Sequence, residues 1–144
     1  MIKYPSGLWL KDLSKTAPPG TGKPRRIKGG PLLSLMALQA AIASKQLDAR
    51  SVWPATRRCQ NSLEDYRWNY DDVLKIFSCL LEVDYKNSEW CSVDGGRTVP
   101  CDAYRICYDE VRRQRNHRST EVYLKFTIDD DNQLRLVLVQ SHFS

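Results

Sequence analysis

The sequence predicts a single α+β domain, in which two or three N-terminal helices pack on a small antiparallel β-sheet. Apolar residues recur with helical spacing in the first half of the chain, and after about residue 100 they alternate with a period of two. Helical segments followed by a meander of strands are typical of one α+β layer. The length of 144 residues fits one domain.

The first predicted helix begins at Pro31, which suits the first turn of a helix, and runs to about Lys45. Within it, Leu32, Leu35 and Ile42 recur at helical spacing. A connector that contains Trp, Arg and Cys follows, with one short helical turn near residues 63–66.

A second long helix is predicted to end near Asp84. Asp71 and Asp72 suit the positive end of its dipole. Its apolar stripe consists of Val73, Ile76, Phe77, Leu80 and Leu81.

Three strands are predicted in the second half, at residues 101–108, 121–128 and 133–140. The second alternates strictly, which places Tyr123, Lys125 and Thr127 on the face opposite its apolar residues. The run Asp-Asp-Asp-Asn at 129–132 is a turn signal, so the last two strands are expected to form a hairpin.

Residues 1–31 are expected to form a flexible basic arm, and residues 32–144 the folded domain. The arm holds seven Lys and Arg residues and one acid, so its net charge is +6. Because the whole chain has a net charge of +5, the domain has a net charge of −1. Its stretch 13–31 contains four Pro and four Gly with few apolar side chains, a composition that cannot offset its ordering entropy by burial.

The five cysteines show neither CxxC spacing nor a histidine at ligand spacing, which argues against a zinc site and a disulfide framework. We therefore expect reduced thiols, no metal and no cofactor. No apolar stretch is long enough to span a bilayer, and the N-terminus lacks the pattern of a signal peptide. The expected location is cytoplasmic.

Four segments, in order along the chain, resemble the MqsR family of bacterial toxins. They are DYK at 84–86, CDAYR at 101–105, EVYLKFTI at 121–128 and LVLVQSH at 136–142. The resemblance covers roughly residues 35–142 and is firmest at EVYLKFTI. It implies a RelE-like fold and an mRNA interferase, the toxin of a type II toxin–antitoxin system. The implied partners are messenger RNA and a cognate antitoxin, which is itself DNA-binding in systems of this kind.

The functional residues of that family match at Lys86 and Tyr123, and the family's closing lysine falls opposite His142. Where the family has a glutamine, this chain has Cys101. A thiol cannot supply the paired donor and acceptor of an amide, so any role of that glutamine in substrate contact is in doubt here.

RNA can be cut without a metal when its own 2′-hydroxyl attacks the adjacent phosphorus. The step needs a base, an acid and a cation near the phosphorane. We assign proton transfer to His142, phosphate contact to Lys86, and orientation or proton donation to Tyr123. The expected substrate contacts are Arg105, Lys125, Arg113 and Arg115. His117 lies within a run of cationic residues and is interpreted as a loop residue.

Two other functions stay open at the level of sequence. One is a non-catalytic RNA- or protein-binding module of the same fold. The presence of Cys101 and His142, which replace family residues, favours this alternative. The other is a protein–protein inhibitor, which would have no affinity for RNA at low salt.

Overall fold

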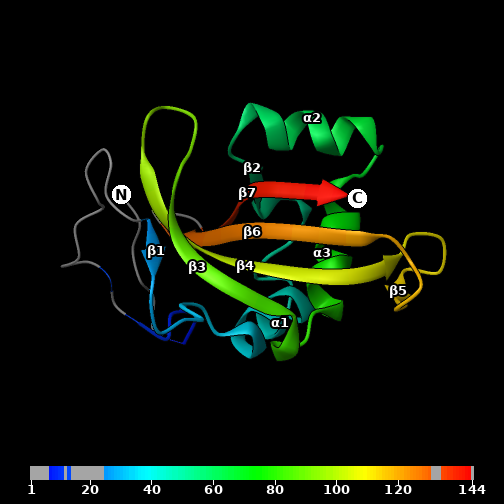
Figure 1. Ribbon diagram of the computed structural model, residues 1–144, viewed down its shortest axis with the longest axis horizontal. Helices are drawn as coiled ribbons and strands as arrows, with labels where there is room; N and C mark the ends of the chain where they lie inside the picture. The colour runs from blue at the N-terminus through cyan, green and yellow to red at the C-terminus, as the bar shows by residue number, and fades with distance from the viewer. Residues whose placement is uncertain (1–6, 12, 14–24, 131–133, 144) are drawn as a thin grey trace.

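The computed structural model describes residues 7–11, 13, 25–130 and 134–143, and for 130, 142 and 143 it describes the backbone alone. Figure 1 shows these residues as one twisted sheet with helices packed against it. No helix among them is both long and apolar enough to cross a membrane.

The described residues form three α-helices, each beginning after a residue whose side chain accepts a hydrogen bond from the first turn. Ser34, Thr56 and Asn69 are these N-caps. The helices are α1 (Leu35–Ala43), α2 (Arg57–Asp65) and α3 (Tyr70–Cys79). The first helix therefore begins after Ser34 and not at Pro31, and α3 is shorter than predicted because a separate 3-10 turn (Glu82–Asp84) follows it.

Seven strands form one sheet in the order β1-β3-β4-β6-β7-β2, with β5 added beside β4. All pairs are antiparallel except β2 with β7, which is parallel. The strands are β1 (Arg26–Ile27), β2 (Val52–Pro54), β3 (Tyr85–Ser92), β4 (Thr98–Asp109), β5 (Gln114–Arg115), β6 (Glu121–Asp130) and β7 (Leu134–Phe143).

The predicted arrangement, N-terminal helices on a small antiparallel sheet of RelE-like type, is wrong. The sheet has seven strands and is mixed, and the strand β2 lies between α1 and α2 along the chain. The sequence did not reveal β2 because it has only three residues and ends in Pro54, and its partner β7 lies far along the chain. The alternation predicted for 121–128 is confirmed, since Val122, Leu124, Phe126 and Ile128 are all buried.

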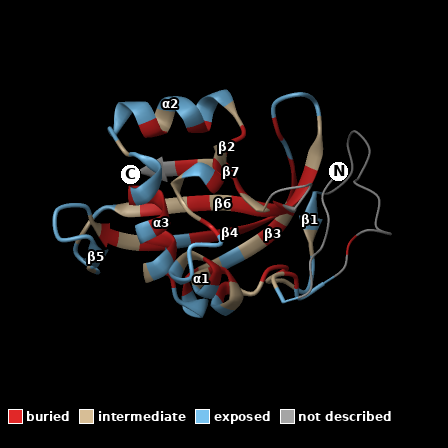
Figure 2. Cartoon of the chain, turned by 180° about the vertical axis from the view of Figure 1, so that it is seen from behind, coloured by how far each residue is buried: buried red, intermediate tan, exposed pale blue. Residues whose placement is uncertain are grey.

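The main core lies between the helices and one face of the sheet. Phe77 of α3 packs edge-on against Phe126 of β6, with ring centroids 4.7 Å apart. Gln39 of α1 donates hydrogen bonds to the carbonyls of Phe77 (3.0 Å) and Leu80 (2.8 Å), and this ties α1 to the end of α3. Figure 2 shows α3 lying across the sheet, with buried residues along it.

Among the described residues, the hairpin of β3 and β4 covers one end of the opposite face of the sheet. Its tip turns through Gly95 and Gly96, both at positive φ, and the amide of Asp94 donates to the carbonyl of Ala55 (2.8 Å) beside β2. A second apolar cluster is buried beneath this hairpin; its members include Val93, Val99, Cys91, Cys101, Val137 and Val139. The other end of this face stays open, and it carries the polar side chains considered below.

Asp102 of β4 is fully buried and holds the segment before α1 against the sheet. Its carboxylate accepts the amides of Leu32 (3.0 Å) and Leu33 (2.9 Å) and the hydroxyl of Ser88 (2.6 Å). Burial raises the pKa of Asp102 although these hydrogen bonds oppose the shift. The cost of burying the carboxylate is thus only partly offset.

The predicted arm, residues 1–31, lies largely outside the described residues. Within its described part, Trp9 and Leu13 are buried in the main core. Trp9 forms an isolated bridge with Leu33, and β1 pairs with β3. None of the five cysteines forms a disulfide.

Candidate functional site

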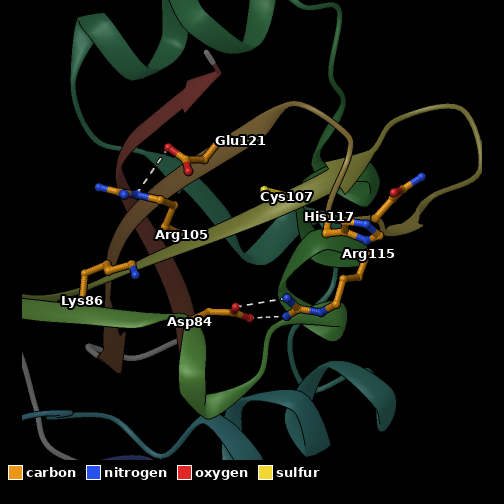
Figure 3. Close-up of a pocket in the computed structure, with 8 residues that line it drawn as sticks. Asp84, Lys86, Arg105, Cys107, Arg115, His117 and Glu121 are labelled. Atoms are coloured by element: carbon orange, nitrogen blue, oxygen red, sulfur yellow. Dashed lines mark hydrogen bonds and ion pairs between the residues drawn. The ribbon is translucent and has the colours of Figure 1, made fainter.

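A cavity of about 510 Å³ opens beside β4 and β6, at the uncovered end of the sheet. We call it the basic pocket. Figure 3 shows Lys86 and Arg105 on one side of it and Arg115 and His117 on the other. The residues that line it are Asp84, Lys86, Arg105, Cys107, Arg115, Asn116, His117 and Glu121.

Lys86 reaches the basic pocket because of an irregularity in the β3–β4 pairing. Tyr85 pairs with Tyr104 and Asn87 with Ala103, so Lys86 is an extra residue without a partner position. Such a bulge re-aims a side chain, and Lys86 is exposed. The 3-10 turn before it is fixed by Asp84, whose carboxylate accepts the amide of Leu81 (2.7 Å).

Arg105 and Glu121 come from neighbouring strands. Arg105 pairs with Tyr123 and Cys107 pairs with Glu121 across β4 and β6, so these four residues form two adjacent rows on one face. Arg105 Nε lies 3.4 Å from Glu121 Oε1. Both side chains are nearly half exposed, and an ion pair of this kind contributes little stability, so Arg105 can exchange Glu121 for an anionic ligand at low cost.

The loop that carries Arg115 and His117 is fixed by two short polar side chains. Asp109 accepts the amides of Val111 and Arg112, both at 3.0 Å, and so closes the turn after β4. The side-chain oxygen of Asn116 accepts a hydrogen bond from the backbone amide of Arg118 (3.0 Å). The backbone amide of Asn116 donates to the carbonyl of Cys107. These bonds set the backbone on both sides of His117.

The basic pocket carries a small positive excess. Arg115 forms an ion pair with Asp84, and this hydrogen bond raises the pKa of Arg115. Arg105 is paired with Glu121, whereas Lys86 has no salt bridge within the described part of the chain. Among the described cations that line the basic pocket, Lys86 is therefore one without a carboxylate partner, and it is available to a ligand.

Of the site residues predicted from sequence, Lys86, Arg105 and Arg115 lie together in the basic pocket. Tyr123 lies directly beside Arg105, and the backbone of His142 pairs with Tyr123 on the next strand. Positions 105, 123 and 142 thus form one row across β4, β6 and β7. The side chain of His142 lies outside what the structure describes.

Lys125 and Arg113 lie elsewhere. Lys125 has an ion pair with Glu89 of β3, and its ammonium lies 5.8 Å from the centroid of the Tyr123 ring. Burial lowers the pKa of Lys125, but the hydrogen bond to Glu89 and the charges of Glu89, Cys91 and Tyr123 together outweigh burial, and the pKa is raised. Arg113 forms an ion pair with Asp72 of α3, outside the basic pocket.

Sequence reasoning did not select His117 or Glu121 for this site. The strand pairing decides both: β5 turns the chain back beside β4, and β6 begins at Glu121 opposite Cys107. The available signal was the pair of turn-forming residues Asp109 and Asn116, which bracket a short return of the chain. Within the described residues, no three His, Cys, Asp or Glu side chains are grouped so that they could hold a metal ion.

Comparison with known proteins adds no relative. No family model, no curated protein and no solved structure matches this chain. The resemblance to the MqsR family therefore stays a prediction from the four sequence segments.

Proposed function

We propose that this protein is an endoribonuclease that cleaves single-stranded RNA without a metal ion, with the basic pocket as its active site. One observation carries the proposal. A histidine, a glutamate and three cationic side chains from four separate segments line the same cavity. This is the set of groups that phosphodiester transfer to a 2′-hydroxyl requires.

In the proposed step, the 2′-oxygen forms a bond to phosphorus and the bond from phosphorus to the 5′-oxygen breaks. Glu121 accepts the proton of the 2′-hydroxyl, and His117 donates a proton to the departing oxygen. Carboxylates and imidazoles are the usual side chains for these roles. Lys86 and Arg105 hold the non-bridging oxygens, where negative charge accumulates.

The neighbouring row of Arg105, Tyr123 and His142 is a second source of proton transfer, and it is the one that the sequence resemblance favours. Its register brings the tyrosine next to Arg105, one row from Glu121. Both assignments use the same face of the sheet and the same phosphate contacts, so substitution of each histidine distinguishes them.

The experiment incubates the purified chain with an end-labelled single-stranded RNA in the presence of EDTA. We expect cleavage that leaves a 2′,3′-cyclic phosphate and a 5′-hydroxyl. His117→Ala is expected to lower the rate by about 10²–10⁴-fold, the usual effect of losing one acid–base group. Lys86→Ala should also lower the rate, whereas Lys75→Ala, an exposed lysine of α3 that does not line the pocket, should not.

Each contrary result has a defined meaning. Products with a 5′-phosphate would exclude attack by the 2′-hydroxyl. If His142→Ala abolishes cleavage and His117→Ala does not, proton transfer belongs to the row that contains Tyr123. RNA that is bound by the parent chain and never cut would identify the non-catalytic module.

For the biological setting, we infer from the resemblance to the MqsR family that the substrate is messenger RNA and that a cognate antitoxin holds the protein inactive. Expression without a partner should then slow growth and deplete messenger RNA, and Lys86→Ala should relieve both effects. Normal growth with abundant folded parent protein would contradict this inference.

A further inference from the structure

A second cavity, of about 450 Å³, lies between α2, β2 and the segment that joins α2 to α3. Figure 1 shows that segment descending from the end of α2 past β7 to α3. We call this cavity the aromatic pocket. Its volume is within the usual range for small-molecule sites. Three of its lining residues are aromatic: Trp53, Trp68 and Tyr70.

Two of the aromatic rings are held by contacts outside the cavity. Arg97 and Arg135 lie 5.8 and 5.1 Å from the centroid of the Trp53 ring. The ring of Trp68 packs against Tyr108 of β4, with centroids 5.9 Å apart. Because two arginines lie over the Trp53 ring, we assign stacking to Trp68 and to the exposed ring of Tyr70. The contact with Tyr108 holds Trp68 in place, which limits the loss of side-chain entropy on binding.

Arg67, which also lines the cavity, occupies a position that favours glycine. Its φ is 55°, and α2 ends there in a Schellman motif. In this motif the backbone amide of Arg67 donates to the backbone carbonyl of Glu64 (3.1 Å), and the backbone amide of Trp68 donates to that of Leu63 (2.9 Å). An arginine in this left-handed conformation is strained. The side chain of Arg67 lines the cavity, so its guanidinium is placed to contact a ligand there.

Glu64 supplies a charge of the opposite sign to the same cavity. Glu64 and Arg67 are both exposed, and within the described ranges neither forms a salt bridge. The cavity therefore offers stacking surfaces, one acceptor-only carboxylate and one guanidinium suited to phosphate.

We propose that the aromatic pocket binds a guanine nucleotide. Guanine presents two adjacent donors, its ring N–H and its exocyclic amino group, which match the two oxygens of a carboxylate. Adenine presents an acceptor beside its amino group and would be repelled by Glu64. Trp68 and Tyr70 stack on the base, and Arg67 binds the phosphate. The site is separate from the basic pocket, and the proposal does not depend on RNA cleavage.

The first experiment titrates the full chain with GMP, AMP and guanosine and follows tryptophan fluorescence. GMP should quench the fluorescence saturably, and AMP and guanosine should bind more weakly by about tenfold, because each lacks a charge-assisted contact. A short single-stranded RNA with one guanosine, run in competition with GMP, shows whether the site prefers a free nucleotide or one within RNA. Lys86→Ala should leave GMP binding unchanged.

The decisive variant is Arg67→Gly. Glycine relieves the left-handed backbone, so the melting temperature should stay equal or rise while GMP binding weakens by about tenfold or more. Lys45→Gly is the matched control, because Lys45 has a φ of 66° after α1 and does not line this cavity; it should leave GMP binding intact. Glu64→Gln should reduce the preference for GMP over AMP. The proposal is overturned if GMP does not quench saturably, if Arg67→Gly binds like the parent, or if Lys86→Ala abolishes binding.

Discussion

Asp102 is the residue whose removal tests the energetics of this fold most directly. The carboxylate satisfies the buried amides of Leu32 and Leu33 and the hydroxyl of Ser88. In Asp102→Ala the two amides lose their acceptor, at a cost of about 1–3 kcal/mol each. The substitution also removes a buried carboxylate, and burial disfavours its charged form and raises its pKa. Removal of this unfavourable burial offsets part of the cost. We expect a net loss of about 2–4 kcal/mol in the free energy of unfolding.

Asp102→Asn should behave differently. The carbonyl oxygen of Asn can accept both amides, and its NH₂ group can donate to the oxygen of Ser88, whose hydroxyl is free to turn toward Tyr85 at 2.7 Å. We therefore expect a loss of no more than about 1 kcal/mol. Because the pKa of Asp102 is raised, its stabilising contribution is complete below pH 3.8 and declines as pH rises through the folded-state pKa. Asp102→Asn should lack this decline.

Urea denaturation of the parent and both variants measures the energies, and amide hydrogen exchange at Leu32 and Leu33 locates the effect. Exchange at these two amides should accelerate in Asp102→Ala and change little in Asp102→Asn. Equal stability of the two variants would refute the assignment of the cost to unsatisfied amides. So would a loss below about 1 kcal/mol in Asp102→Ala.

Three further outcomes follow from contacts in and around the core. Burial raises the pKa of the Cys59 thiol to about 11 from 9.0, so its contribution is complete below pH 9.0 and is lost as pH rises through 11; melting temperatures across that range should fall more steeply in the parent than in Cys59→Ala. Gln39→Glu should lower the free energy of unfolding by about 1–2 kcal/mol, measured in urea, because a carboxylate cannot donate to the last carbonyls of α3. Lys125→Met should cost about 1–3 kcal/mol by leaving Glu89 half-buried without its partner, and the added change Glu89→Gln should recover part of that loss in thermal melts.

The parts of the fold that the sequence predicts are those with local signals. Apolar and polar residues alternate along 121–128 because one face of β6 packs in the main core and the other face is polar. The sequence therefore shows the period of two that is typical of a strand. The strand β3 carries no such signal. It contains Lys86, Ser88 and Glu89, and these polar residues serve the basic pocket, the Asp102 network and the pair with Lys125.

The residues of the candidate site also differ in whether a local sequence pattern predicts their position. Arg105 is recognisable because it lies on a strand that the sequence reveals. His117 is not, because its position depends on hydrogen bonds that the side chains of Asp109 and Asn116 accept where the chain turns back toward β4. Those bonds depend on the turn's geometry and leave no periodic pattern. Residues on regular elements can thus be placed from the sequence, whereas residues on a structured loop need the structure.

The place of β7 in the sheet has a consequence for synthesis of the protein. β7 lies between β6 and β2, and it follows all the other described strands along the chain. Val52 can pair with Leu136 only after Leu136 has been synthesised, so β2 has no hydrogen-bonded neighbour in the described sheet until β7 has been made. Pairings between such distant residues slow folding. The sheet therefore cannot be completed before β7 has been made, and a chain that stalls before residue 134 would present the bare edge of β6 to other proteins.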